Sequence, residues 1–348
     1  MAIDDGGSTV KILYGVQATG NGHITRARVM APALKAAGIE VDYLFSGRPK
    51  EALFDMECFG DYQVFRGMTF HMGDGAKVRP WTTLMNNSLT QLIKDARALD
   101  LDCYDLVLTD FEPVTAWAAK FKKVKTIGLA HQYAFKHKLP DKGLSLLLRP
   151  GVSIFAPVNV PIGVHWDHFN RDIIPPLISP PRFERSIEDK QILVYLPFER
   201  AETLTRWFSG FPDYTFHVFA KCDAPYQVEN VQFNPLSRDQ FEQCLARCDG
   251  VISNCGFGLA SEAMQYGKRF LTKPMKGQSE QRSNAILLES LERATVIDEW
   301  NRAHVADWLA TPHPDPMSFA GVADHIAAWI ASGATLPVSS VIQRCWMR

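Results

Sequence analysis

The chain has 348 residues, of which 46% are hydrophobic, and this is enough apolar material for two hydrophobic cores of roughly 150 residues each. Its 37 basic and 38 acidic residues give a net charge of −1, so the excess of positive charge that marks most nucleic-acid-binding proteins is absent. We therefore expect two domains and no nucleic-acid partner.

The cysteines and the apolar runs predict a cytoplasmic location. The seven cysteines are an odd number and none belongs to a C-x-x-C pair, which argues against a disulfide framework and against a zinc ribbon. The segment from Met1 to Thr9 lacks the basic start and the long apolar stretch of a signal peptide. No apolar run approaches the roughly 20 residues that span a bilayer.

The first half of the chain alternates short β-rich runs with longer amphipathic stretches, which is typical of parallel α/β units. Several runs end in polar residues, as buried parallel strands do when they deliver side chains to a site at their carboxyl ends. We expect a Rossmann-like domain over residues 1–160. Its predicted elements are strand Lys11–Val16, helix Ile24–Ala37, and strands Ile39–Ser46, Asp105–Asp110 and Lys125–Ala130.

A proline-rich segment follows, with seven prolines between positions 150 and 181. Proline disfavours helix interiors and central strands, so residues 161–189 are expected to connect two domains. The alternation then restarts and predicts a second doubly wound domain over residues 190–315. Its predicted strands are Gln191–Leu196, Tyr214–Ala220, Gly250–Ser253, Arg269–Lys273 and Thr295–Ile297, and its helices are Ala201–Phe208, Arg238–Cys248, Leu259–Tyr266, Gln281–Glu292 and Arg302–Leu309.

Residues 316–348 are expected to form a C-terminal helix, from Pro316 to Ala331, and a tail. Whether this part packs back across the domain junction is left open. The expected fold is thus α/β, with two Rossmann-like, doubly wound parallel sheets.

A glycine-rich loop, Gly20-Asn21-Gly22-His23, leaves the first strand and opens a helix, so a ligand could approach backbone N–H groups at the positive helix end. A dinucleotide fingerprint would need a third glycine where Thr25 stands and an acidic end to the second strand, which instead ends in Ser46. A nicotinamide or flavin enzyme is therefore not expected.

Three polar residues lie where this domain's catalytic groups should lie. At the helix start, His23 is a candidate base, with helix capping or loop packing as the alternative. Asp110 and Glu112 end a predicted strand on the same edge and could orient His23 or act as base, whereas a helix N-cap is the structural alternative. His131 follows the next strand and could meet the second substrate.

A longer motif stands in the second half, from Ser253 to Met264. A strand ends at Asn254, two glycines (Gly256 and Gly258) let backbone approach a ligand, and the following helix N-terminus suits a diphosphate. About one turn into that helix, Glu262 could accept hydrogen bonds from two ribose hydroxyls. Glu280 and Gln281 precede or open the next helix and could bind sugar hydroxyls.

From Asn254 to Glu262 the spacing resembles the donor-binding motif of the family B (GT-B) glycosyltransferases, which include glucosyl- and glucuronosyltransferases and the bacterial peptidoglycan N-acetylglucosaminyltransferase. In the glucosyltransferases this motif begins His-Cys-Gly-Trp-Asn-Ser and has a Glu eight residues after the His. Cys255 and Gly256 match directly, and Asn254 takes the place of the phosphate-binding His. Glu262 falls on the ribose-binding Glu.

Besides Asn254, three positions of this motif depart from the family pattern. Phe257 stands for the Trp, while Gly258 and Leu259 stand for the Asn and the Ser. The later Glu280-Gln281-x-x-Asn284-Ala285 is similar to the family's Asp-Gln-x-x-Asn-Ala, whose first two residues contact the transferred sugar. The opening Gly20–His23 loop resembles the loop that carries the catalytic base, or lies beside it, in the same superfamily.

The resemblance implies two lobes facing across a cleft, with an acceptor bound by the first and a nucleotide diphosphate sugar, UDP-sugar above others, by the second. It implies an inverting sugar transfer to an acceptor hydroxyl, with the leaving phosphate held by a helix N-terminus and no metal or other cofactor required. A nucleotide-sugar 2-epimerase of the same fold and a non-catalytic nucleotide-sugar-binding protein remain alternatives.

The expected acceptor is a glycan, a glycolipid or another small molecule, by analogy with family members that build cell-surface glycans. Two basic runs, Lys120–Lys125 and Lys136–Lys138, precede the apolar run Leu144–Leu148 and Arg149. This patch could contact anionic lipid at the inner membrane face, and a solvated helix end is the alternative.

Overall fold

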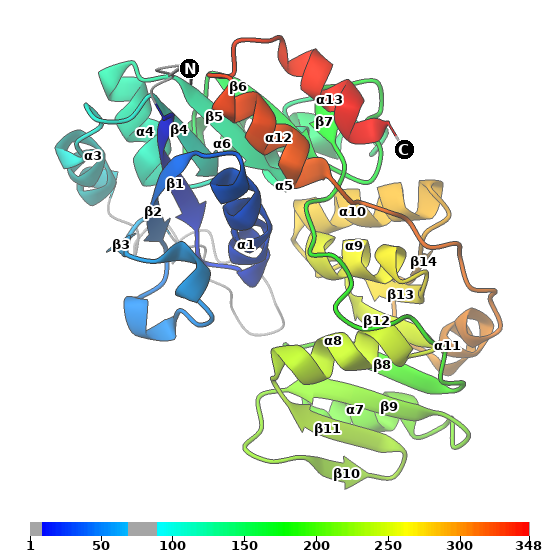
Figure 1. The fold of residues 1–348 in the computed structure, drawn as a ribbon. Helices are drawn as coiled ribbons and strands as arrows, with labels where there is room; N and C mark the ends of the chain where they lie inside the picture. The colour runs from blue at the N-terminus through cyan, green and yellow to red at the C-terminus, as the bar shows by residue number, and fades with distance from the viewer. Residues whose placement is uncertain (1–8, 69–88, 348) are drawn as a thin grey trace, which may run out of the picture.

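The computed structural model describes residues 9–68 and 89–347, which form two α/β lobes, one above the other in Figure 1. Within these residues each lobe has a seven-stranded sheet, in the order β3-β2-β1-β4-β5-β6-β7 and β10-β11-β9-β8-β12-β13-β14. Every neighbouring pair is parallel except β10 with β11. Apart from the edge strands β7 and β10, the two sheets share one strand order, which confirms the prediction of two doubly wound domains.

The elements of the first lobe are β1 (Lys11–Gln17), α1 (Asn21–Ala36), β2 (Glu40–Ser46), η1 (Lys50–Ala52), η2 (Glu57–Phe59), β3 (Tyr62–Phe65), α3 (Leu89–Ala98), β4 (Leu106–Asp110), α4 (Pro113–Lys122), β5 (Thr126–Ala130), α5 (His131–Ala134), α6 (Leu144–Phe155), β6 (Val160–Val164) and β7 (Ile173–Ile174). The elements that follow are β8 (Gln191–Tyr195), α7 (Ala201–Phe208), β9 (Thr215–Ala220), β10 (Tyr226–Val228), β11 (Val231–Pro235), α8 (Arg238–Arg247), β12 (Gly250–Asn254), α9 (Phe257–Gln265), β13 (Arg269–Lys273), α10 (Ser279–Ser290), β14 (Thr295–Val296), α11 (Arg302–Leu309), α12 (Val322–Ala331) and α13 (Val338–Trp346). None of the described helices combines the length and the apolar character that crossing a bilayer requires.

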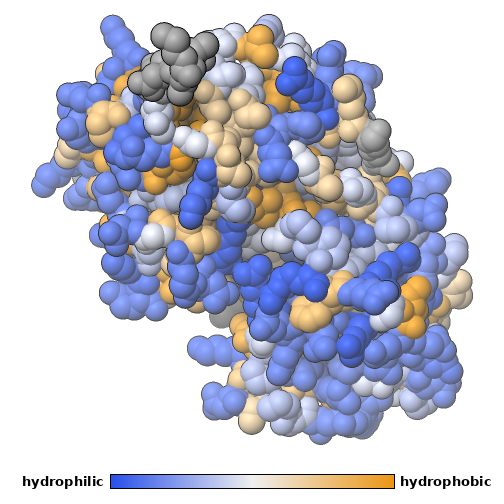
Figure 2. Space-filling model, in the orientation of Figure 1, coloured by the Kyte–Doolittle hydropathy of each residue, from blue (hydrophilic) through white to orange (hydrophobic). Residues whose placement is uncertain are grey.

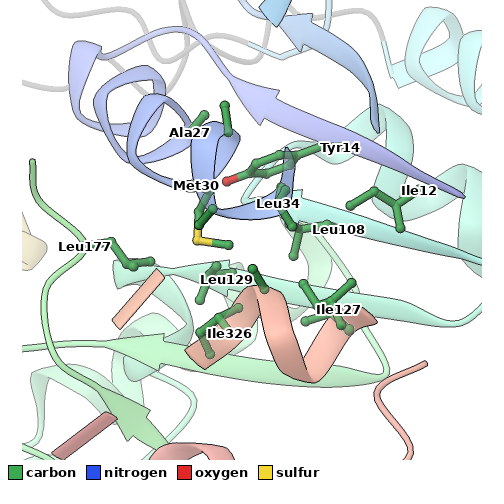
Figure 3. Packing of buried hydrophobic residues seen from close by; sticks show 14 of the residues in the cluster. Ile12, Tyr14, Ala27, Met30, Leu34, Leu108, Ile127, Leu129, Leu177 and Ile326 are labelled. Atoms are coloured by element: carbon green, nitrogen blue, oxygen red, sulfur yellow. The ribbon is translucent and has the colours of Figure 1, made fainter. Parts of the chain in front are cut away.

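The alternation of side chains along β1 explains how helices cover both faces of the first sheet. Successive side chains of a strand point to opposite faces. Ile12 and Tyr14 pack in one core with Met30 of α1, whereas Leu13 packs in another core on the opposite face. Figure 3 shows the first of these cores, in which residues of α1 and α12 lie against the strands.

The first sheet extends into the segment that was expected to be a linker. β6 pairs with β5, and β7 pairs with Gly163 and Val164 of β6, so residues up to Ile174 belong to this sheet. Pro161 is accommodated because β7 leaves the outer edge of β6 unpaired at that position, where a missing N–H breaks no ladder bond. The expected start of the linker at residue 161 is thus corrected.

The C-terminal helices return to the first lobe. Ile326 and Ile330 of α12 are buried in the same core as Met30, and Figure 3 shows Ile326 beside Leu129 of β5. The ammonium of Lys125 donates to the carbonyls at positions 333 and 334, at 2.9 and 2.7 Å. The tail thereby ties the end of the second domain to the sheet of the first.

One apolar core spans the junction between the lobes. Tyr133 and Trp166 of the first lobe share it with Leu245, Ala263 and Leu287 of the second. The carboxyl edge of the first sheet faces this junction, as the arrowhead of β1 in Figure 1 shows. The lobes are therefore packed together next to the edge where site residues are expected.

Gly163 allows α5 to approach β6 closely and offers a test of this packing. A Cβ at Gly163 would lie 2.7 Å from the Cα of Ala134 and 2.9 Å from its N, which are backbone atoms that cannot rotate away. We expect Gly163→Ala to lower the free energy of unfolding by about 1–3 kcal/mol in urea denaturation. Gly151→Ala is the control, because a Cβ there meets nothing within 4 Å and helix α6 should tolerate or gain from it. Equal effects of the two changes would contradict the close packing.

Candidate active site

The glycine loop of the first lobe leaves the N-terminus of α1 open. Gly20 is the N-cap of α1 and no side chain caps the helix. A Cβ at Gly20 or at Gly22 would meet nothing within 4 Å. Free N–H groups at this end can therefore be reached by a ligand.

His23, Asp110 and Arg26 form a hydrogen-bonded cluster beside this loop. Asp110 ends β4, which pairs with β1 so that Asp110 lies opposite Val16. Its Oδ1 is 2.7 Å from His23 Nδ1 and 2.5 Å from Arg26 Nη2, and its Oδ2 accepts from Arg26 Nε at 2.7 Å. The carboxylate thus holds an imidazole and a guanidinium that lie one turn apart on α1.

The charges of this cluster keep Asp110 ionised. Burial of the fully enclosed carboxyl would raise the pKa of Asp110, but the charges of Arg26 and His23 outweigh burial and hold that pKa below its usual range. No described residue bonds to the second nitrogen of His23, and 14% of its side chain stays exposed. His23 is therefore oriented by a carboxylate and still accessible, as a general base must be.

Glu112 does not join this cluster. It is the N-cap of α4, where its carboxylate accepts from the N–H groups of Val114 and Thr115 at 2.8 and 2.7 Å and from the Ser46 hydroxyl at 2.6 Å. Of the two interpretations of Glu112, the structure supports the helix cap, and its assignment to the catalytic group is corrected. Phe111 between the two acids adopts a left-handed conformation (φ 55°), so the chain turns sharply after Asp110.

His131 is covered by the second lobe and does not face an open acceptor site. Its side chain is 2% exposed, with Nδ1 3.0 Å from the Val164 carbonyl and Nε2 3.0 Å from Asn284 Oδ1. Burial lowers the pKa of His131. This residue is a contact between the lobes, which corrects its expected place among the acceptor residues.

The donor motif of the second lobe also ends in an open helix N-terminus. Asn254 closes β12 and donates to the Lys273 carbonyl at 3.2 Å. Gly256 is the N-cap of α9, without a side-chain cap, and a Cβ at Gly256 or Gly258 would meet nothing within 4 Å. Cys255 is buried, which raises the pKa of its thiol to about 12, so it is a packing residue rather than a nucleophile.

Phe257 links the motif to the first lobe. Its ring stacks on His131 with 4.1 Å between ring centres, and on Trp166 with 5.0 Å. The indole N–H of Trp166 donates to Ser261 Oγ at 2.8 Å. The residue that replaces the family's Trp is thus part of the junction and brings the start of α9 against α5.

The acidic residues of the second lobe differ in their surroundings. Glu262 keeps part of its side chain exposed, but the protein around its carboxyl displaces water, and this desolvation, with the charge of Glu242 nearby, raises the pKa of Glu262 to about 7. Glu280 accepts from Gln132 of the first lobe at 3.3 Å and keeps 38% of its side chain exposed. Gln281 accepts from the Met275 N–H at 3.0 Å, so its carbonyl is held by its own loop.

The two groups of predicted residues meet across the junction. His131 lies 3.9 Å from Glu280, and Arg26 is close enough to Glu280 for the two charges to interact. Figure 2 shows an indentation between the two lobes. Arg26 was not predicted, although its place three residues after His23 puts it on the same helix face and could have indicated it.

The described residues contain no group of three or more His, Cys, Asp or Glu side chains arranged to hold a metal ion.

The family model described as "Glycosyl transferase family 1" matches residues 10–145 and 169–312. The chain belongs to this family. It is a glycosyltransferase, and the predicted family resemblance is confirmed.

Solved structures with the same fold cover nearly the whole glycosyltransferase. The glycotransferase of kitacinnamycin aligns with a TM-score of 0.61 and 16% identity over 97% of this chain and 96% of its own. LpCGTa in complex with UDP aligns at 0.60 and 15% identity, covering 98% and 100%. MurG of Acinetobacter baumannii aligns at 0.54 and 14% identity, covering 97% and 93%. No curated protein matches the chain.

These similarities confirm the GT-B fold, because alignments over almost the full length of both chains include both lobes. At 14–16% identity they bear on the fold alone. The substrates of this glycosyltransferase must therefore be inferred from its own residues.

The ion pair of Arg26 with Asp110 should dominate the stability of the first lobe's site. Arg26→Met leaves a buried carboxylate without its guanidinium, and we expect the free energy of unfolding at pH 7 to fall by about 3–5 kcal/mol. Asp110→Asn added to Arg26→Met should restore part of that loss, since no buried charge remains. Urea denaturation of the single and double variants measures both effects.

Arg28→Met is the matched control on the same helix, because the hydrogen bonds that Arg28 donates within the described residues go to the backbone carbonyls of Phe54 and Asp55 and not to a buried carboxylate. We expect it to cost less than about 1 kcal/mol. Losses that simply add in the double variant would show that Arg26 and Asp110 are not coupled.

Proposed function

We propose that this glycosyltransferase transfers a sugar from a nucleotide diphosphate sugar, with a UDP-sugar favoured, to an acceptor hydroxyl with inversion and without a metal ion. The observation that carries the proposal is the 2.7 Å contact of His23 with Asp110 beside an open helix end in one lobe, opposite a second open helix end in the other. A base and a phosphate site are the two parts that such a transfer requires.

His23 would act as the base. With the Nδ1 proton donated to Asp110, the lone pair of Nε2 is available to take the proton of the acceptor hydroxyl as that oxygen attacks the anomeric carbon. The Asp110 carboxylate then stabilises the imidazolium that forms. The bond from the anomeric carbon to the donor phosphate breaks on the opposite side, which gives inversion.

The start of α9 would hold the leaving diphosphate. Open backbone at Gly256 and Gly258 lets phosphate oxygens approach the N–H groups of the first turn, where the helix dipole stabilises negative charge. Asn254 can add a hydrogen bond but no charge. Glu262 would accept from ribose hydroxyls, and Glu280 with Gln281 would contact the sugar. A bound UDP in the LpCGTa structure supports a nucleotide donor.

The proposal extends to the acceptor and to the setting of the reaction. A glycan, glycolipid or other small acceptor, used in building cell-surface material, would enter beside Gly20 to Gly22. A cytoplasmic location is supported by seven cysteines that all remain unpaired. A peripheral contact with the inner membrane face belongs to the same proposal.

Removing the base should separate chemistry from binding. We expect His23→Ala to lower the turnover of a UDP-sugar by about 100-fold or more while the UDP dissociation constant changes little. His325→Ala, an exposed histidine on α12, is the control and should keep normal turnover. Turnover is measured as the release of UDP from the UDP-sugar. Nucleotide binding is measured as the thermal shift of the protein with UDP, GDP, dTDP and ADP.

Several outcomes would reject the proposal. A new sugar isomer formed from donor alone would indicate a nucleotide-sugar 2-epimerase. Nucleotide binding without release or transfer would indicate a binding protein. Absence of any shift with all four nucleotides would remove the donor site, and unchanged turnover in His23→Ala would remove the base.

The raised pKa of Glu262 predicts a pH dependence of donor binding. Only the ionised carboxylate is a full acceptor for two hydroxyls, and with a pKa of about 7 roughly a tenth of it is ionised at pH 6. The UDP dissociation constant should therefore rise several-fold, up to about tenfold, between pH 8 and pH 6. Titration calorimetry at these pH values measures it.

The Glu262→Gln variant should bind UDP more weakly, and its UDP dissociation constant should no longer depend on pH between pH 6 and pH 8. Because Glu242 contributes to the raised pKa of Glu262, Glu242→Gln should move the transition to lower pH without removing it. The same pH dependence in Glu262→Gln as in the unchanged protein would assign it to another group.

A further inference from the structure

One face of the first lobe combines exposed apolar side chains with several Lys and Arg residues. Leu147 and Ile154 of α6 are 76% and 68% exposed, and Leu146 and Phe121 are 43% and 39% exposed. Leu147 and Ile154 are seven residues apart, so two turns of α6 present them on the same side. Large aliphatic side chains that are this exposed in a helix mark a contact surface when they gather together.

A contact between α4 and the C-terminal part of α6 joins these residues into one surface. The indole N–H of Trp117 on α4 donates to the Ile154 carbonyl at 3.1 Å. Trp117 packs against Phe121 with 5.5 Å between ring centres, and Lys120 lies 4.5 Å above the Trp117 ring. We call the exposed residues Phe121, Leu146, Leu147 and Ile154, with the basic residues around them, the α4–α6 face.

The charge of this part of the chain is strongly asymmetric. Residues 113–166 carry eight Lys or Arg and a single acid, Asp141, although the whole chain has a net charge of −1. Asp141 is fully buried, where it accepts from Ser145 and from Ser283 of the second lobe. It therefore does not neutralise the surface. The exposed cations are Lys120, Lys122, Lys123, Lys138, Lys142 and Arg149.

We infer that the α4–α6 face docks onto the surface of an anionic bilayer. Aliphatic side chains flanked by Lys and Arg fit the boundary between acyl chains and anionic headgroups, where both kinds of group are stabilised. A second copy of this chain fits poorly, because an interface with twofold symmetry would set the same cations against each other. The occupant is thus a lipid surface with negative headgroups.

The position of the α4–α6 face also connects membrane docking with sugar transfer. This connection rests on the proposed function. α6 packs against α10, whose first turn carries Glu280, and Ser283 of α10 donates to Asp141, three residues before α6, at 2.7 Å. A bilayer against α6 therefore lies next to the residues proposed to hold the sugar. This placement favours an acceptor that is itself embedded in the membrane, such as a glycolipid.

Flotation with vesicles tests the inference on the full chain. At low salt we expect the protein to float with vesicles of phosphatidylcholine and phosphatidylglycerol but not with vesicles of phosphatidylcholine alone. In an assay buffer with about 0.5 M salt it should float less, because salt screens the surface charges. Leu147→Glu with Ile154→Glu should weaken flotation by about tenfold or more. Replacing Lys120, Lys122 and Lys123 with Gln should weaken it by about 100-fold.

Matched variants separate the surface from general effects of charge. Ile187→Glu with Leu336→Glu adds the same two charges at apolar residues that are 45% and 49% exposed elsewhere, and should float normally. Leu147→Ser with Ile154→Ser changes no charge and should still weaken flotation. All variants should keep the unfolding temperature of the parent protein, since the substituted side chains are exposed.

Three results would overturn the inference. The first is absence of flotation with anionic vesicles at low salt. The second is flotation of the Leu147 and Ile154 variants that equals that of the parent protein. The third is a dimer, seen in sedimentation velocity, that the same variants dissociate. Flotation is measured without donor or acceptor, and nucleotide binding is measured without lipid. Failure of the docking surface and failure of the proposed transfer are therefore distinguishable.

Discussion

Apolar packing across the junction holds the carboxyl edges of the two sheets against each other. Phe257 stacks on His131 and Trp166, and these rings are part of a core that includes residues of both lobes. The polar residues of the two lobes could not act on a common ligand without this contact. Since the packing involves the first residue of α9, it also positions the helix end proposed to bind phosphate.

Helix ends and strand ends supply the polar groups at this junction. In both sheets the neighbouring strands β1 and β4, or β8 and β12, lead to connections on opposite sides, which leaves a crevice at their carboxyl ends. His23 follows β1, Asp110 ends β4, and Asn254 ends β12. The duplicated strand order therefore places two equivalent openings face to face.

The buried carboxylate of Asp110 shows how this site balances charge. A lone carboxylate at such a position would be strongly destabilised, and Arg26 removes that cost while leaving His23 hydrogen-bonded. In the second lobe the balance differs, because Asn254 is neutral and Glu262 has a raised pKa. Arg26 of the first lobe thus brings a positive charge to the junction, in addition to the partial charges of the helix ends.

The sequence by itself determined the class of fold, the two open glycine turns and the family, because these depend on local alternation and on residue spacing that one segment contains. It also identified the residues at strand ends, which follow from the period of two along a strand. The edge strand β7 escaped notice because its two residues are followed directly by prolines, whereas the equally short β14 was predicted.

Tertiary structure decided which of the candidate side chains face one another. Asp110 and Glu112 are two residues apart and chemically alike, but the left-handed turn at Phe111 sends one to His23 and the other to the N-terminus of α4. His131 resembled any polar strand end until the second lobe covered it with Asn284 and Phe257. The place of His131 depends on Asn284, which is 153 residues away in the chain, and Asp110 meets His23 across 87 residues. No local pattern of residues contains contacts of this kind.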